Sequence, residues 1–306
     1  MDFLPIINSI LSLAVVMALG IVARKTGVLK EDHKPVLSAY IYYFALPALF
    51  CAEIAGTDFL ELELKLFTGS VLPVAMAFGL LVLLHLLKLL NKDRFVITSL
   101  TVVFGSNAFF GVAFFQNLWG EWGFHTAVLA ASILGMIGVT ASLFLFEYAT
   151  SKGKAVKVLA RVMKSPVILA IGAGLVLSLL QIKIPLLING LSLLGRTAAG
   201  VAIFLLGMFL YDNFSLHIFT RALGYSLLRV ILLPCGMLLS FYLMGELSAE
   251  LKQFLLLQTG IPVAISVAVF AHRYEYHTPL LSGIVVLTSL LSFLSLSLLY
   301  FLAQAV

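Results

Sequence analysis

Two short groups of polar and helix-breaking residues interrupt apolar stretches that are otherwise long enough to cross a membrane. The first group is Gly105, Ser106 and Asn107, and the second is Gln258, Thr259, Gly260 and Pro262. Glycine and proline break helices, and the four polar side chains offer hydrogen bonds. A helix that resumes after a break also presents free N–H groups and a partly positive end. These residues together predict a binding site for a carboxylate. The alternative is that the two helices are only kinked, pack against each other and bind no ligand.

Three further residues are candidates for the same substrate site. Arg196 and Arg229 lie inside apolar stretches. Each could extend to the membrane interface, or one of them could face a cavity and attract an anion. Tyr43, close to Pro47, is a third candidate, with packing as its alternative. The predicted middle of the membrane contains no acidic residue, which argues against a carboxylate-based sodium or proton site, although backbone carbonyls and Gln258 could still bind sodium.

Composition places the chain in a membrane. Hydrophobic residues make up 62% of 306 positions and charged residues 11%, against about 45–50% and about 25% in soluble domains. In a soluble protein, a net charge of +5 would suggest binding to nucleic acid. In a membrane protein the distribution of the charges matters more than their total, so no nucleic-acid partner is predicted. The sequence contains no metalloprotease HExxH, nucleophile elbow, P-loop or paired cysteines, so neither an enzyme, a cofactor nor a metal site is predicted.

The apolar stretches predict an all-α membrane protein with ten transmembrane helices. They cover residues 4–23, 36–54, 66–88, 95–118, 124–148, 166–182, 190–211, 223–244, 252–272 and 279–304. The basic connection 151–165 predicts either a short amphipathic helix on the membrane surface or a solvated linker.

The two halves, 1–150 and 151–306, have the same order of features. Each has two helices, a third that contains proline (Pro73, Pro234), a broken fourth and a fifth. Because five is an odd number, the second half must enter the membrane in the opposite orientation. The sequence therefore predicts two inverted five-helix repeats with broken crossover helices 4 and 9, an arrangement typical of secondary transporters.

Basic residues predict the orientation. Fourteen of the 19 Lys and Arg residues fall in connections on one side, and three (Lys65, Lys183 and Lys252) fall on the other. Positive charge concentrates on the cytoplasmic side of membrane proteins. The prediction is a multi-pass protein of the cell (inner) membrane with both termini outside.

Several segments resemble the auxin efflux carrier family, including its bacterial members, within the bile acid/auxin/arsenite-type transporter superfamily. Residues 20–29 (GIVARKTGVL) are similar to its first-helix ending, and 37–50 to its second helix. Residues 104–111 (FGSNAFFG) and 257–262 (LQTGIP), followed by 271–274 (AHRY), are similar to its two crossovers, and Arg229 matches a basic residue that the family often has before Pro234. The chain departs from the family at Val112 and Gly200, near which proline is common.

The resemblance implies a scaffold domain (helices 1, 2, 6 and 7) and a transport domain (helices 3–5 and 8–10) that move relative to each other like an elevator. It also implies small organic anions, mono- or dicarboxylates, as substrates, and homodimers formed through the scaffold. The alternative is a sodium-coupled symporter of bile-acid-like or other amphipathic organic anions, because the bile acid:sodium symporters are similar in architecture. Coupling to protons is a further possibility.

Overall fold

The computed structural model describes residues 4–57, 64–150, 160–213 and 215–304, and within them the protein is all helical. In chain order the elements are α1 (Leu4–Lys25), α2 (His33–Tyr40), η1 (Ile41–Ala45), α3 (Leu46–Gly56), α4 (Leu64–Leu86), α5 (Lys92–Val103), η2 (Asn107–Gly111), α6 (Val112–Thr150), α8 (Pro166–Leu179), α9 (Pro185–Gly195), α10 (Thr197–Asn213), α11 (Leu216–Met244), α12 (Ala249–Thr259), α13 (Ile265–Arg273) and α14 (Thr278–Ala303). The elements η1 and η2 are single turns of π-helix.

These helices lie close to the predicted apolar stretches. The stretch predicted at 66–88 is α4, and the one predicted at 279–304 is α14. Within the described residues, six helical stretches are long and apolar enough to cross a membrane by length and composition. The described residues are therefore all helical with six candidate membrane spans, and the count of ten membrane helices in two inverted repeats stays a prediction.

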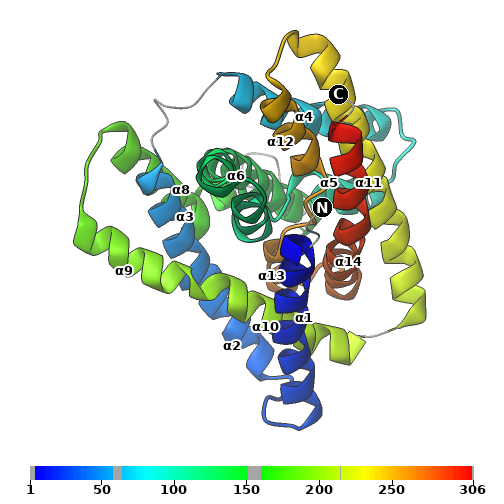
Figure 1. The fold of residues 1–306 in the computed structure, drawn as a ribbon. Coiled ribbons are helices and arrows are strands. Elements are labelled where there is room, and N and C mark those ends of the chain that lie inside the picture. Colours follow the sequence, from blue (N-terminus) through cyan, green and yellow to red (C-terminus); the bar gives the residue numbers. More distant parts are fainter. Residues whose placement is uncertain (1–3, 58–63, 151–159, 214, 305–306) are drawn as a thin grey trace.

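Figure 1 shows how the helices are arranged. Helices α3, α8 and α9 lie together on one side of the molecule, and α4, α11, α12 and α14 lie on another, with α6 between them. Helix α1 packs along α10. The α1–α10 pair is so close that a Cβ on Gly20 would lie 2.0 Å from the carbonyl oxygen of Phe204. Glycine is therefore required there.

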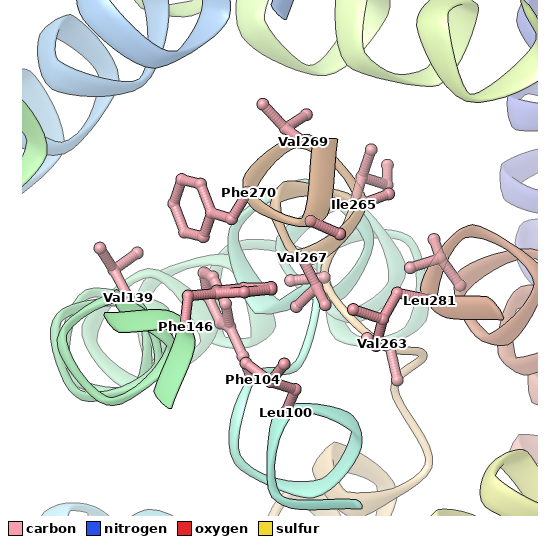
Figure 2. Packing of buried hydrophobic residues seen from close by; sticks show 14 of the residues in the cluster. Leu100, Phe104, Val139, Phe146, Val263, Ile265, Val267, Val269, Phe270 and Leu281 are labelled. Atoms are coloured by element: carbon pink, nitrogen blue, oxygen red, sulfur yellow. The ribbon is translucent and has the colours of Figure 1, made fainter. Parts of the chain in front are cut away.

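The short helices α5 and α13 are enclosed by protein. Residues 95–103 and 265–271 are buried without exception. Figure 2 shows Phe104, Phe146, Val267 and Phe270 converging between α5, α6 and α13. A helix that is hydrophobic on all sides is expected to be buried on all sides. This enclosure keeps the ends of both half-helices away from lipid, where free backbone groups would be costly.

The structure differs from the predicted segments in two places. The boundary predicted between 118 and 124 is a kink at Trp119 and Gly120 inside α6, where Gly120 has φ +62°. The stretch predicted as one helix at 190–211 begins earlier, at Pro185, and is interrupted at Arg196. Proline is favoured in the first turn of a helix because its missing N–H needs no partner there.

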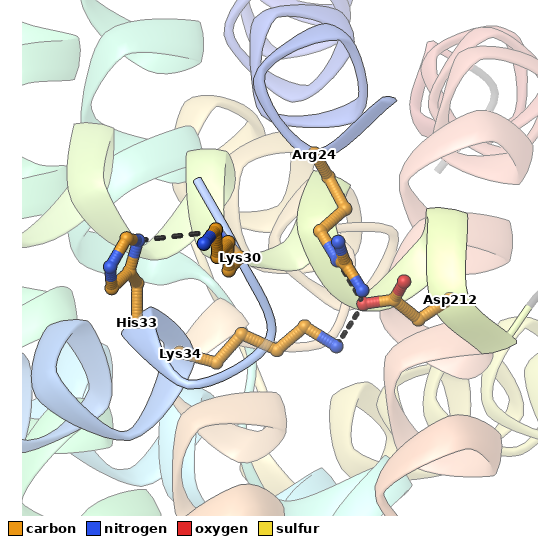
Figure 3. Close-up of polar contacts among 5 residues, drawn as sticks. All are labelled: Arg24, Lys30, His33, Lys34 and Asp212. Carbon is orange, nitrogen blue, oxygen red and sulfur yellow. Dashed lines mark hydrogen bonds and ion pairs between the residues drawn. The ribbon is translucent and has the colours of Figure 1, made fainter. Parts of the chain in front are cut away.

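An ionic cluster joins the ends of α1, α2 and α10. Asp212 accepts a hydrogen bond from Arg24 Nε at 2.9 Å and pairs with Lys34, whose side chain is buried (Figure 3). In the same view, His33 Nδ1 accepts a hydrogen bond from the backbone N–H of Lys30 at 3.1 Å. Of the predicted surface helix 151–165, residues 151–159 lie outside the described part of the chain.

Candidate functional site

The two predicted breaks are present, and they lie against each other. Helix α5 ends at Val103 and α12 ends at Thr259. Gly105 forms an antiparallel bridge with Val263. The N–H of Ser106 donates to the carbonyl of Pro262 at 2.8 Å, and the N–H of Ala264 donates to that of Phe104 at 3.0 Å. The two extended links therefore satisfy each other's backbone groups, which is how broken helices are tolerated at membrane depth.

Arg229 of α11 joins the two breaks. Its side chain is buried within the protein. Nε and Nη2 donate to the carbonyl of Ile261 at 3.2 and 2.9 Å, and Nη1 donates to the carbonyls of Thr101 and Val102 at 2.5 and 2.9 Å. These carbonyls lie at the C-terminal ends of α5 and α12, which carry partial negative charge. Arg229 thus neutralises both helix ends and takes up carbonyls that the breaks leave free.

The glycine at the first break makes room for this arginine. A Cβ on Gly105 would lie 2.8 Å from Nη2 of Arg229 and 3.0 Å from Nδ2 of Asn107. The backbone of the second break has an additional partner, since the N–H of Val263 donates to Oγ1 of Thr288 at 3.2 Å. Thr288 is one of several hydroxyl residues in α14, so nothing in the local sequence distinguishes it.

Asn107 begins the resumed half-helix and is buried. Its Nδ2 donates to the carbonyl of Gly105 at 3.3 Å, while Oδ1 has no partner among the described residues. The backbone N–H groups of Asn107, Ala108 and Phe109 likewise have no acceptor within the described part of the chain. The start of η2 therefore presents unused donors and a partly positive helix end.

The place where residues 104–106 pair with residues 262–264 is called the crossing below. A small cavity of about 20 Å³ adjoins it, with room for about one water molecule. Its polar lining is Ser70, Gly105, Asn107, Arg229, Gln258 and Thr259. Oγ of Ser70, like Oδ1 of Asn107, is buried without a partner among the described residues. The cavity is therefore lined by two buried polar atoms that no protein group satisfies among the described residues.

A larger cavity of about 330 Å³ lies between α3, α6 and α9, and is called the lateral cavity below. Its polar lining is Glu53, Ser132, Asn189, Ser192 and Arg196, and its apolar lining is Leu49, Ala52, Ala108, Val112, Phe124, Val128, Ala131 and Ile188. Ala108 places the start of η2, next to the crossing, on the wall of this cavity. Neither the Glu53 carboxylate nor the Arg196 guanidinium has an ion-pair or hydrogen-bond partner within the described residues.

The structure brings together some of the predicted site residues and separates others. Gly105, Asn107, Gln258, Thr259 and Arg229 line the small cavity. Ser106 and Pro262 pair through their backbones, and Gly260 packs against α14, where a Cβ would lie 2.8 Å from Leu299.

Arg196 and Tyr43 do not join that group. Arg196 lines the lateral cavity. The hydroxyl of Tyr43 accepts a hydrogen bond from Nη2 of Arg273 at 2.5 Å, and the Arg273 guanidinium lies over the rings of Tyr42 and Tyr43, with 5.7 and 5.4 Å to the ring centroids. Tyr43 therefore contacts the end of α13, away from the crossing.

Glu53 is not among the residues predicted for the site from the sequence. The side chain is half-buried and lines the lateral cavity. An acidic residue between apolar neighbours in α3 was the available signal.

Residues 5–300 match the protein family described as membrane transport protein. A comparison with curated proteins gave no match.

Proposed function

This chain belongs to the membrane transport protein family, and from that premise we propose a secondary transporter that moves a small organic anion, such as a mono- or dicarboxylate. Family membership makes it a membrane transporter and not an enzyme, and confirms the resemblance to the auxin efflux carrier family. The substrate class, the mechanism and the residues that bind the substrate are the proposed part.

The observation that carries the proposal is the wall of the lateral cavity. Arg196 lines it without an ion-pair partner among the described residues, and Ala108, at the start of η2, lines it too. A guanidinium forms strong, often bidentate hydrogen bonds with a carboxylate, and a helix start with free N–H groups attracts negative charge. A substrate carboxylate would bind between these two positive features.

The proposed movement is elevator-like. Helices α1 to α3 and α8 to α10 would form the scaffold, and α4 to α6 and α11 to α14 the transport domain. The lateral cavity supports this division because α3 and α9 form one wall and η2 and α6 form the other. Asn107 and the breaks would then travel with the transport domain, and Arg229 would keep the two half-helices together during the movement.

The proposed orientation follows the positive-inside rule, with both termini outside the inner membrane and the lateral cavity nearer the outer side. Homodimers through the scaffold remain part of the proposal.

Transport assays in proteoliposomes test this function. We expect saturable uptake of a radiolabelled carboxylate and counterflow when the vesicles are preloaded, because an alternating-access site faces one side at a time. Flux that rises linearly with substrate concentration and shows unitary currents would instead identify a channel. Uptake that requires an inward sodium gradient would favour the alternative, a sodium-coupled symporter of amphipathic anions.

A further inference from the structure

We propose that the lateral cavity selects carboxylates that also carry an ammonium group, with Glu53 as the ligand of that group and Arg196 as the ligand of the carboxylate. This inference rests on the proposed transport function and narrows its substrate class to zwitterionic amino-carboxylates. It assigns a role to Glu53, which the proposed anion site alone leaves without one.

Glu53 is difficult to explain as a structural residue. It is half-buried in α3, between the buried residues Ala52 and Ile54, and has no ion-pair or side-chain hydrogen-bond partner within the described residues. Ionisable side chains in membrane-spanning segments are costly and usually serve a binding or transport role. A carboxylate that keeps no protein partner and faces a cavity is available to a ligand.

The two charges lie on the same wall without forming an ion pair. Helices α3 and α9 approach so closely that a Cβ on Gly195 would lie 2.6 Å from Cα of Leu49. Arg196 follows Gly195, and Glu53 is one helical turn beyond Leu49, a displacement of about 6 Å along the helix axis. No Glu53–Arg196 contact within 4.0 Å is present in the described part of the chain. A ligand whose ammonium and carboxylate groups are joined through one carbon atom could bind both protein charges at once.

The remaining lining agrees with a small zwitterion. Asn189 and Ser192 of α9 add polar side chains beside Arg196, and apolar residues such as Phe124 and Ile188 leave room for a side chain of the substrate. A second carboxylate on the substrate would meet Glu53, and like charges in a partly desolvated site repel. A simple monocarboxylate would leave Glu53 unpaired. The amino-carboxylate is the class that satisfies both charges.

Matched pairs of ligands test the proposal: alanine with propionate, aspartate with succinate, and phenylalanine with 3-phenylpropionate. Binding is measured by calorimetry on purified protein. We expect the amino member of at least one pair to bind about tenfold or more tightly, since a charge-assisted hydrogen bond contributes at least that factor. In Glu53→Gln this preference should disappear, and in Glu53→Asp, which keeps the charge, it should return in part.

The control is Glu121→Gln, the same change at a side chain of α6 that is 85% exposed; it should keep the wild-type preference. Equal binding of both members by the wild type, or an unchanged preference in Glu53→Gln, would overturn this inference and leave the proposed anion transport standing. If no member of any pair binds, but binding of another organic anion is lost in Arg196→Gln, the inference fails alone. If no carboxylate binds at all, both proposals fail.

Discussion

Arg229 donates two hydrogen bonds, from Nε and Nη2, to the carbonyl oxygen of Ile261, and so attaches α11 to the second helix break. Through Nη1 the same side chain reaches the carbonyls at the end of α5. One guanidinium therefore replaces the hydrogen-bond partners that two helices lose where they stop. It also leaves a positive charge beside the crossing, without a carboxylate partner among the described residues.

Replacing Arg229 should destabilise the protein. In Arg229→Ala three buried carbonyls lose their donor, at about 1–3 kcal/mol for each unsatisfied group, so we expect a clear decrease in the thermal unfolding midpoint in detergent and loss of uptake. Arg221→Ala is the control, because Arg221 is an exposed residue of the same helix. If Arg229→Ala unfolded at the wild-type temperature, its capping role would be refuted.

Gly105→Ala should disturb the same contact by a steric route. The new Cβ would lie 2.8 Å from Nη2 of Arg229, which must then move. We expect reduced uptake and a lower unfolding temperature. The matched control is Gly79→Ala in α4, where a Cβ has no neighbour within 4 Å and alanine favours the helix by about 1 kcal/mol. Equal behaviour of the two variants in both measurements would contradict the steric argument.

Asn107→Ala tests the crossing as a binding site. The hydrogen bond from Nδ2 to Gly105 is long, at 3.3 Å, and Oδ1 has no partner among the described residues, so the loss of folding stability should be small. If the amide contacts the substrate, losing a hydrogen bond to a charged group costs about 1.5–3 kcal/mol, which is roughly a tenfold or larger increase in KM for uptake. Ser142→Ala, another buried polar side chain without a partner in the described residues, serves as control. Wild-type KM in both variants would show that Asn107 is structural.

Arg196→Gln should separate binding from stability. Arg196 is exposed and has no ion-pair partner in the described part of the chain, so its removal should leave the unfolding temperature nearly unchanged. We expect a tenfold or larger loss of carboxylate affinity, because a charge-assisted hydrogen bond is lost. Lys183→Gln provides the control for a change of charge on the same side. Unchanged affinity in Arg196→Gln would remove Arg196 from the site.

The topology can be tested with single cysteines on a background that lacks Cys51 and Cys235. A membrane-impermeant thiol reagent added to intact cells should label cysteine at position 183 and should not label cysteine at position 30, because the positive-inside rule places the basic connection after α1 in the cytoplasm. Disruption of the cells should expose position 30. The reverse pattern would invert the proposed orientation.

The sequence determined the features that depend on neighbouring residues. Hydrophobic length predicted where the helices lie, since burying an apolar stretch in lipid requires it to satisfy its own backbone hydrogen bonds. Gly105, Asn107, Gly260 and Pro262 predicted both breaks, because glycine and proline disfavour helix wherever they occur.

Only the tertiary structure decided which partners the charged residues have. Arg229 was recognisable from the sequence as a charge inside an apolar helix. Its acceptors, however, are main-chain carbonyls 32 and up to 128 residues away. The sequence cannot indicate which carbonyl accepts, because every residue has one. Glu53 and Arg196 line one cavity because glycine at position 195 lets α9 approach α3 at Leu49. Such proximity arises from helix packing over a long separation in the chain, and local residue preferences contain no information about it.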